Sequence, residues 1–355
     1  MHPLASHPAH DRPLRIGMLA PIAWRVPPRA YGPWERVVSL LTEGLVAAGA
    51  DVTLFATADS CTSARLSAVV PSPYEETPGL DVKVWEGLHL ANAFGQAASF
   101  DLIHNHYDFL PLTYASLVDT PTISTIHGFS SDRILPVYRA FNGLAAYVSI
   151  SDADRHPDLT YLATIHHGLD FGEFTFRDLP GDYLLFFGRI HPDKGAADAI
   201  RVARATNRPL VLAGIVQDQG YFEREIEPHL GERVRYVGPV GPEERDALLG
   251  GALGLLHLIH FDEPFGLSVV EAMACGTPVI AYRRGSMAEV IAPGESGVLV
   301  PDEAAAAEAV GLLHTFNRWT VRAHAERFSV ARMVEAYLHA YRAVLERQAI
   351  NTSGR

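Results

Sequence analysis

The feature that most constrains the fold is a repeated alternation of short apolar β-type runs with amphipathic helical segments. Leu14–Ala20 predicts a first strand, Trp34–Ala48 a helix that Gly49 ends, and Asp51–Ala56 the next strand. Strands that alternate with helices favour parallel sheets, because each helix carries the chain back across the sheet. The sequence therefore predicts an α/β protein with doubly wound parallel sheets.

The alternation begins a second time at Tyr183–Phe187, which indicates two domains of similar architecture. A chain of 355 residues is long enough for two domains. The segment Phe171–Asp182 carries two glycines and a proline with little periodicity, and it predicts the boundary. The expected organisation is a flexible tail, an N-terminal Rossmann-like domain, a C-terminal Rossmann-like domain and a helix that crosses back to the first domain: 1–13, 14–172, 173–328 and 329–355.

Charge and composition exclude several classes of protein. The net charge of −12 argues against nucleic acid as a partner, because phosphate binding needs a basic surface. Residues 14–172 carry 9 Arg and Lys against 16 Asp and Glu, which disfavours anionic lipid as a partner and favours a soluble one, although a local basic patch stays open. The cysteines, Cys61 and Cys275, are too few for a disulfide framework and suit the cytoplasm. The His- and Pro-rich start lacks the pattern of a signal peptide.

Two loops that follow first strands are the places to seek a ligand, because doubly wound sheets bind ligands at the carboxyl ends of their strands. The first loop is 21–33 and the second is 188–195. In the second, Gly188 allows close approach to the backbone, and Arg189 and Lys194 place two cations before a helix start. This arrangement suits a diphosphate, and the alternative is a turn with solvated charges.

The second chemical signal lies in residues 262–282, where Glu263 precedes a short helix, Leu267–Ala274, that contains Glu271. The N–H groups at the helix start have no partner within the helix and could hold hydroxyls or phosphate. An ionised Glu271 on so apolar a helix needs a partner, which a ribose diol would supply. The alternative is a single solvated glutamate.

Other polar clusters favour structural roles over a metal site. Asp152 and Asp154 form an Asp-x-Asp where a strand is expected to give way to a helix, so capping is favoured over metal binding. His104 and His106, like the adjacent His166 and His167, lack the spacing of a helical zinc motif. A separate possibility is that His106 and Asp108 line a ligand site, and that Tyr31 and Trp34 stack on its ligand or serve packing.

Together these motifs resemble the retaining glycosyltransferases of family 4, which have the GT-B fold of two Rossmann-like domains facing a central cleft. The resemblance rests on the Gly188–Lys194 loop, on Glu263 and Glu271 with seven residues between them, and on weaker stretches in the expected order: YGPWERVVSLL from Tyr31, DLIHNHYDF from Asp101, TISTIHGF from Thr122, VSISDADR from Val148 and IHHGLD from Ile165. Pro33 departs from the family, in which a second glycine is common. It has no N–H to donate, and it could instead begin the helix.

The resemblance implies that 14–172 is the acceptor domain and 173–328 the donor domain, and it implies a role for each matched residue. Four residues would be catalytic. His127 would reach the transferred sugar, and Glu263 would support charge at the anomeric carbon. Arg189 and Lys194 would stabilise the departing diphosphate. Glu271 would bind the ribose, and the base would pack near residues 237–240. The expected donor-binding residues are Gly32, Gly188, Arg189, Lys194, Val237, Gly238, Phe265, Gly266, Leu267, Ser268 and Glu271, and the acceptor residues are Tyr31, His106 and Asp108.

The expected activity is transfer of a hexose from a nucleotide-diphosphate sugar to an acceptor hydroxyl, with retention of configuration and with no metal or other cofactor. On resemblance alone the donor is UDP-glucose. The partners would be the nucleotide sugar and a small-molecule or glycan acceptor that no motif identifies. Two alternatives stay open: another GT-B enzyme such as a phosphorylase, and a protein that binds sugar nucleotides without catalysis.

Overall fold

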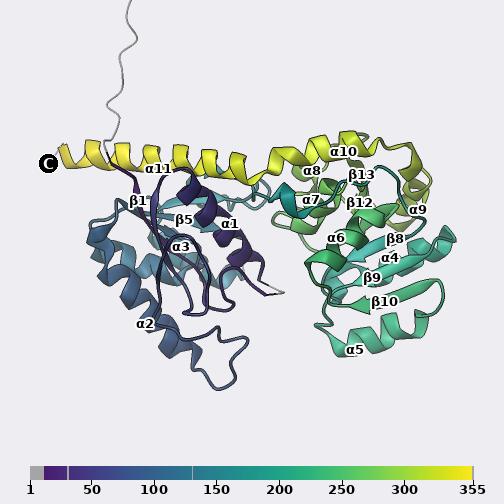
Figure 1. Cartoon of the computed structure of the whole chain (residues 1–355), viewed down its shortest axis with the longest axis horizontal. Coiled ribbons are helices and arrows are strands. Elements are labelled where there is room, and N and C mark those ends of the chain that lie inside the picture. Colours follow the sequence, from purple (N-terminus) through teal and green to yellow (C-terminus); the bar gives the residue numbers. More distant parts are fainter. Residues whose placement is uncertain (1–11, 30–31, 130, 354–355) are drawn as a thin grey trace, which may run out of the picture. The chain divides into compact units, whose positions relative to one another are not determined.

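The structure is a computed structural model that describes residues 12–29, 32–129 and 131–353, with side chains to residue 350. The chain forms two compact units, residues 1–147 with 337–355 and residues 148–336 (Figure 1). Most of the expected N-terminal tail, 1–13, lies outside the described residues. Its last part is held in place, since the Arg12 guanidinium donates two hydrogen bonds of 2.7 Å to Asp101.

The first sheet has seven strands among the described residues, in the order β3-β2-β1-β4-β5-β6-β7. The pairs β1–β2, β1–β4, β2–β3 and β4–β5 are parallel. Its strands are β1 Arg15–Leu19, β2 Asp51–Phe55, β3 Arg65–Ser67, β4 Leu102–Asn105, β5 Thr122–Ile126, β6 Ala146–Ser149 and β7 Tyr161–Thr164. The order reverses between β1 and β4, which defines the switch point of this sheet.

The second sheet has six strands in the described chain, in the order β10-β9-β8-β11-β12-β13, and every neighbouring pair is parallel. Its strands are β8 Leu184–Phe187, β9 Leu210–Ala213, β10 Val234–Gly238, β11 Gly254–His257, β12 Val279–Tyr282 and β13 Gly297–Val300. The switch point lies between β8 and β11. The prediction of two doubly wound parallel sheets is therefore confirmed.

Helices connect the strands, and α1 and α7 lie within a residue of the bounds predicted for them. The α-helices are α1 Pro33–Ala47, α2 Val82–Gly95, α3 Leu135–Ala140, α4 Ala196–Ala205, α5 Gln219–Tyr221, α6 Pro242–Gly251, α7 Leu267–Ala274, α8 Met287–Val290, α9 Glu303–Val310, α10 Arg318–Ala325 and α11 Val330–Ser353. After α5 the chain continues as a π-helical turn, 222–226, followed by a 3-10 turn, 227–229. Pro228, which has no N–H for a regular helix, lies in that second turn. No helix among the described residues is both long and apolar enough to cross a membrane.

The core of the second unit lies on both faces of its sheet. Leu184 and Phe186 belong to one buried apolar cluster, while Leu185 between them belongs to another. Successive side chains of a strand point to opposite faces, so a strand buried on both faces reads as a continuous apolar run. Figure 1 shows β8, β9 and β10 side by side in this unit, with their connecting helices around them.

The boundary between the two compact units falls at 147/148, within β6, whereas the sequence predicts a boundary after residue 172. The sheet order supports the later boundary, since β7 still belongs to the first sheet. The segment after β6 is nevertheless built into the second unit. Ile150 and Leu169 are buried in a core cluster of that unit, and the Leu169 N–H donates to the Phe328 carbonyl at 2.8 Å.

The C-terminal part of α11 belongs to the first unit from Tyr337 on, where two tyrosines are wholly buried. The Tyr341 hydroxyl lies 2.8 Å from His104 Nδ1, and the Tyr337 hydroxyl lies 2.8 Å from Thr125 Oγ1. His104 Nε2 lies 2.8 Å from that same Thr125 oxygen. Burial keeps the pKa of His104 well below its ordinary value, so the ring stays neutral and depends on these bonds.

We expect Tyr341→Phe to destabilise the first unit by about 1–3 kcal/mol, because it leaves a buried imidazole nitrogen without its hydroxyl partner. Urea unfolding followed by circular dichroism measures the loss. Tyr114→Phe is the control, because the Tyr114 ring stacks on Phe94 and takes no part in this cluster. Equal stability of the two variants would show that the Tyr341 bond contributes nothing measurable.

Candidate functional site

The loop after β8 is shaped by close backbone contacts at the switch point of the second sheet. It passes from Gly188 through a 3-10 turn, Pro192–Lys194, to Gly195, which begins α4 with a φ of 74°. A Cβ at Gly195 would lie 1.8 Å from the Leu258 carbonyl oxygen, so only glycine fits here. This contact holds Lys194 beside the loop that follows β11.

Lys194 and Glu263, predicted from separate motifs, form an ion pair. Lys194 Nζ donates to Glu263 Oε2 at 2.9 Å, and the ammonium lies 4.4 Å from the centre of the Phe261 ring. His257 Nε2 lies 3.6 Å from the same carboxylate oxygen, beyond hydrogen-bond distance. Burial on its own would raise the pKa of Glu263, but His257 and Lys194 outweigh it and lower that pKa to about 2. Glu263 is therefore a fixed carboxylate near neutral pH, suited to stabilise positive charge and unable to donate a proton.

Glu263 is held by its backbone as well as by its side chain. The Ser286 N–H donates to the Glu263 carbonyl at 2.9 Å, and the Ser286 hydroxyl donates to the Phe265 carbonyl at 2.9 Å. Gly285 packs so closely that a Cβ would lie 2.3 Å from the Glu263 oxygen. The Phe265 side chain is buried in the core, which leaves its backbone for any contact with a donor.

Helix α7 begins at Gly266, whose φ of 90° suits glycine, and it places Leu267 and Ser268 in the first turn. The first N–H groups of a helix have no partner within it, so this end can bind an anion or hydroxyls. The predicted geometry of the motif, a carboxylate before the helix and another one turn into it, is therefore present. Contact with a donor stays a prediction.

The sequence predicts that an ionised Glu271 needs a partner, and an arginine of the same unit supplies one. Glu271 is buried, and its Oε1 accepts a hydrogen bond of 3.3 Å from Arg245 Nη1. Arg245 Nη2 also donates to Glu173 at 3.3 Å, and its guanidinium stacks 4.8 Å from the Phe174 ring centre. Arg245 was missed because it comes from α6, where only a tertiary contact reveals its role. A ribose would therefore bind to a Glu271 carboxylate that is already paired with Arg245.

The remaining predicted donor residues of the second unit lie at the same carboxyl edge of its sheet, whereas Gly32 lies in the first unit before α1. Gly188 follows β8, and its N–H donates to the Ala213 carbonyl of β9 at 3.0 Å. The Gly214 N–H donates in turn to the Gly238 carbonyl at the end of β10, at 2.8 Å. Val237 is 38% exposed, so an apolar surface is available to a base there. Arg189, the residue after Gly188, donates to the Gln217 side chain.

In the first unit His127 follows β5 and ends a chain of buried histidines. His127 Nε2 lies 2.8 Å from His106 Nδ1, and His106 Nε2 lies 3.2 Å from His104 Nδ1. The Trp34 ring stacks on the His127 ring with centroids 5.2 Å apart. His106 is wholly buried and its ring contacts His127. Contact of His106 with an acceptor and contact of His127 with the transferred sugar stay predictions.

The loop that precedes α1 confirms one prediction and leaves another open. Pro33 is the first residue of α1, and Gly32 precedes it with a φ of 143° that favours glycine. The Gly32 carbonyl accepts from the Arg36 N–H at 2.9 Å. Tyr31, a predicted acceptor residue, lies outside the described residues. Asp108 lies at the opposite side of the switch point, after β4.

The segment around Asp152 and Asp154 does not cap a helix, because a turn and not a helix follows β6. The Asp152 and Ala153 N–H groups donate to the Glu289 carboxylate at 2.8 and 2.7 Å, so the turn is anchored from α8. Burial, together with Glu289, raises the pKa of Asp154 to about 7. Within the described residues, no cluster of three or more His, Cys, Asp or Glu side chains could hold a metal ion.

Comparisons with known proteins agree with this geometry in both units. Residues 34–157 match the family model described as Glycosyltransferase Family 4, and residues 174–318 match the model described as Glycosyl transferases group 1. Two doubly wound sheets with these matches define a glycosyltransferase of the GT-B class. The two models together cover most of the sequence, and the chain belongs to glycosyltransferase family 4.

Named relatives and solved structures extend the comparison. The chain is 28% identical to a glycogen synthase of Mycobacterium tuberculosis over 78% of its length and 80% of that protein. It is 26% identical to a D-inositol 3-phosphate glycosyltransferase of Jonesia denitrificans over 98% of its length and 99% of that protein. The fold matches Anabaena Alr3699/HepE, solved with UDP and glucose, with a TM-score of 0.71 at 18% identity, covering 93% of this chain and 100% of that one.

Proposed function

We propose that this glycosyltransferase moves a hexose from a nucleotide-diphosphate sugar, with UDP-glucose as the first choice, to an acceptor hydroxyl with retention of configuration. The observation that carries the proposal is the ion pair of Lys194 with a permanently ionised Glu263 at the switch point of the second sheet. A departing diphosphate needs fixed cations, and a sugar with cationic character needs a carboxylate. This pair supplies one of each on adjacent loops.

The remaining parts of the proposal follow from the same edge of the sheet. Arg189 joins Lys194 on the diphosphate, the start of α7 contacts the sugar, and Glu271 with Arg245 binds the ribose. These charges perform the task that a metal ion performs elsewhere, so the reaction proceeds without one. Support for UDP-glucose comes from the ligands of Alr3699/HepE, which was solved with UDP and glucose. We place the reaction in the cytoplasm, where cysteines such as Cys61 and Cys275 stay unpaired.

Thermal shift with UDP, GDP, ADP and TDP, each with and without EDTA, tests the donor site. A nucleotide at about 100 times its dissociation constant stabilises a protein by roughly 2.7 kcal/mol, which raises the melting temperature by several degrees. We expect UDP to give that shift and EDTA to leave it unchanged. Turnover of UDP-glucose then separates a transferase from a protein that only binds. The absence of any nucleotide shift would overturn the donor site.

Glu271→Gln is expected to weaken UDP binding about 10- to 100-fold, because it removes a charge-assisted hydrogen bond to the ribose. Isothermal titration calorimetry with UDP measures the change. Glu173→Gln is a matched control, because both carboxylates contact Arg245 at 3.3 Å. If the two variants lose affinity equally, Glu271 acts by placing Arg245 and the ribose assignment fails.

A further inference from the structure

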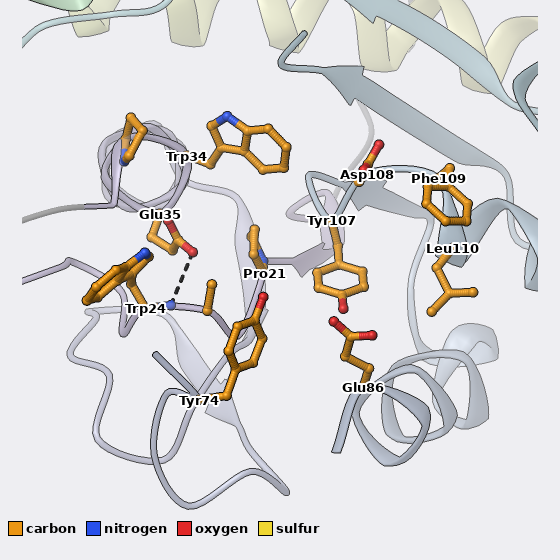
Figure 2. Close-up of a pocket in the computed structure, with 12 residues that line it drawn as sticks. Pro21, Trp24, Trp34, Glu35, Tyr74, Glu86, Tyr107, Asp108, Phe109 and Leu110 are labelled. Atoms are coloured by element: carbon orange, nitrogen blue, oxygen red, sulfur yellow. Dashed lines mark hydrogen bonds between the residues drawn. The ribbon is translucent and has the colours of Figure 1, made fainter. Parts of the chain in front are cut away.

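A pocket of about 420 Å³ opens at the switch point of the first sheet (Figure 2). The loops after β1 and β4 form two of its walls, and helices α1 and α2 and the segment between β3 and α2 contribute the others. Ligands of doubly wound sheets bind at this edge. The residues that line the pocket are Pro21, Ala23, Trp24, Pro33, Trp34, Glu35, Tyr74, Glu86, Tyr107, Asp108, Phe109 and Leu110.

The lining combines aromatic rings with carboxylates and contains no Lys, Arg or His among the residues just named. Tyr107 donates a hydrogen bond to the Glu86 carboxylate, and Figure 2 shows these two groups directed toward each other, with the Tyr74 ring nearby. Aromatic faces and fixed acceptors are the groups that bind the faces and hydroxyls of a polyol. A phosphate would find only negative charge.

Glu35 is the most deeply buried of the three carboxylates, with 3% of the residue exposed. Its Oε1 accepts a hydrogen bond from the Trp24 N–H at 3.3 Å, which Figure 2 marks. Burial raises the pKa of Glu35 to about 7, and no cation of the described residues opposes that effect. Tyr74 is the titratable neighbour on the next wall, and burial, with smaller effects of Glu86, Glu75 and Glu35, raises its pKa to about 12. A buried carboxylate in an aromatic pocket would gain most from a cationic ligand.

Two further observations connect the pocket with the reaction. Trp34, on its wall, stacks on His127, the residue predicted to reach the transferred sugar. Asp108 is one of the few non-glycine residues with a positive φ, 60°, and its Oδ1 accepts from the Tyr138 hydroxyl at 2.7 Å. Strained backbone that is fixed in this way is typical of functional sites.

We propose that this pocket binds the acceptor, and that the acceptor is an unphosphorylated polyol that carries an amino group, an amino sugar or aminocyclitol. The proposal rests on the proposed function, since it names the second substrate of that transfer. The ammonium group lies against Glu35 and the aromatic rings, while Glu86 and Asp108 accept hydrogen bonds from hydroxyls.

Three ring-matched probes test the charge preference: scyllo-inosamine, scyllo-inositol and myo-inositol 1-phosphate, titrated into the full chain by saturation-transfer NMR. We expect the amine to bind at least tenfold more tightly than the neutral polyol, and the phosphate to bind least. Equal binding of the three probes, a preference for the phosphate, or no binding of any probe at millimolar concentration would each overturn the proposal. UDP titration of the same sample reports on the donor site separately, so failure of one proposal is distinguishable from failure of the other.

Glu35→Gln assigns the preference to this pocket. The variant should fold, because it replaces a buried carboxyl by a neutral group of the same shape, and it should lose at least tenfold in affinity for the amine with unchanged affinity for UDP. Glu75→Gln is the control, since Glu75 is exposed, lies beside Tyr74 and does not line the pocket. Unchanged amine binding in Glu35→Gln, or an equal loss in both variants, would contradict the assignment.

Discussion

Lys194→Met is expected to lower kcat for glycosyl transfer by about 10²- to 10³-fold, as the loss of one preorganised charge contact does elsewhere. The Lys194 side chain is only 16% exposed and its ammonium is already oriented by Glu263 and the Phe261 ring, so a departing diphosphate meets a cation that needs no rearrangement. Methionine retains most of the volume and removes the charge. Initial rates with UDP-glucose at saturating acceptor measure the effect.

The chain offers a matched control, because its other lysine, Lys83, is exposed on α2. Lys83→Met should keep the wild-type rate. Removing Lys194 also leaves the Glu263 carboxylate without its closest cation, and an unpaired carboxylate can itself cause misfolding. In the double variant Lys194→Met/Glu263→Gln both side chains are neutral, so comparing the stability of the two variants separates misfolding from the loss of the cation. A folded single variant with wild-type kcat would sink the diphosphate role of Lys194.

The donor-side charges could be predicted from sequence because each lies at the end of a strand pattern. Lys194 follows β8 and Glu263 follows β11, and these strands are neighbours in the observed order. The motif spacing therefore needed only the standard doubly wound topology to bring the two side chains together. The strands themselves could be predicted from local sequence, because a strand that is buried on both faces is a continuous apolar run.

The partners that tertiary packing supplies could not be predicted in this way. Arg245 reaches Glu271 from a different helix, and no spacing rule links the two positions. Glu35 resembles an ordinary solvated helix residue in sequence, yet it is buried because the Trp24 loop folds over the first turn of α1. The anchoring of the Asp152 turn by Glu289 likewise joins residues more than 130 positions apart.

Gly195→Ala is expected to destabilise the second unit by about 3 kcal/mol or more, since it adds a positive-φ penalty of roughly 1–2 kcal/mol to overpacking that typically costs 1–3 kcal/mol. The added methyl would lie 1.8 Å from the Leu258 carbonyl oxygen, which belongs to backbone and has no rotamer in which to move aside. At about 2–4 °C per kcal/mol the melting temperature should fall by roughly 6–12 °C.

The same substitution should also weaken nucleotide binding, because Gly195 fixes the end of the loop that carries Lys194 and any shift of Leu258 is transmitted toward Glu263. Gly231→Ala is the control, as a Cβ there meets nothing within 4 Å, and its stability should stay within about 0.5 kcal/mol of the wild type. Differential scanning fluorimetry with and without UDP measures both effects. If Gly195→Ala melts like Gly231→Ala and binds UDP normally, the loop after β8 is not held by this contact, and the placement of Lys194 must depend on its ion pair alone.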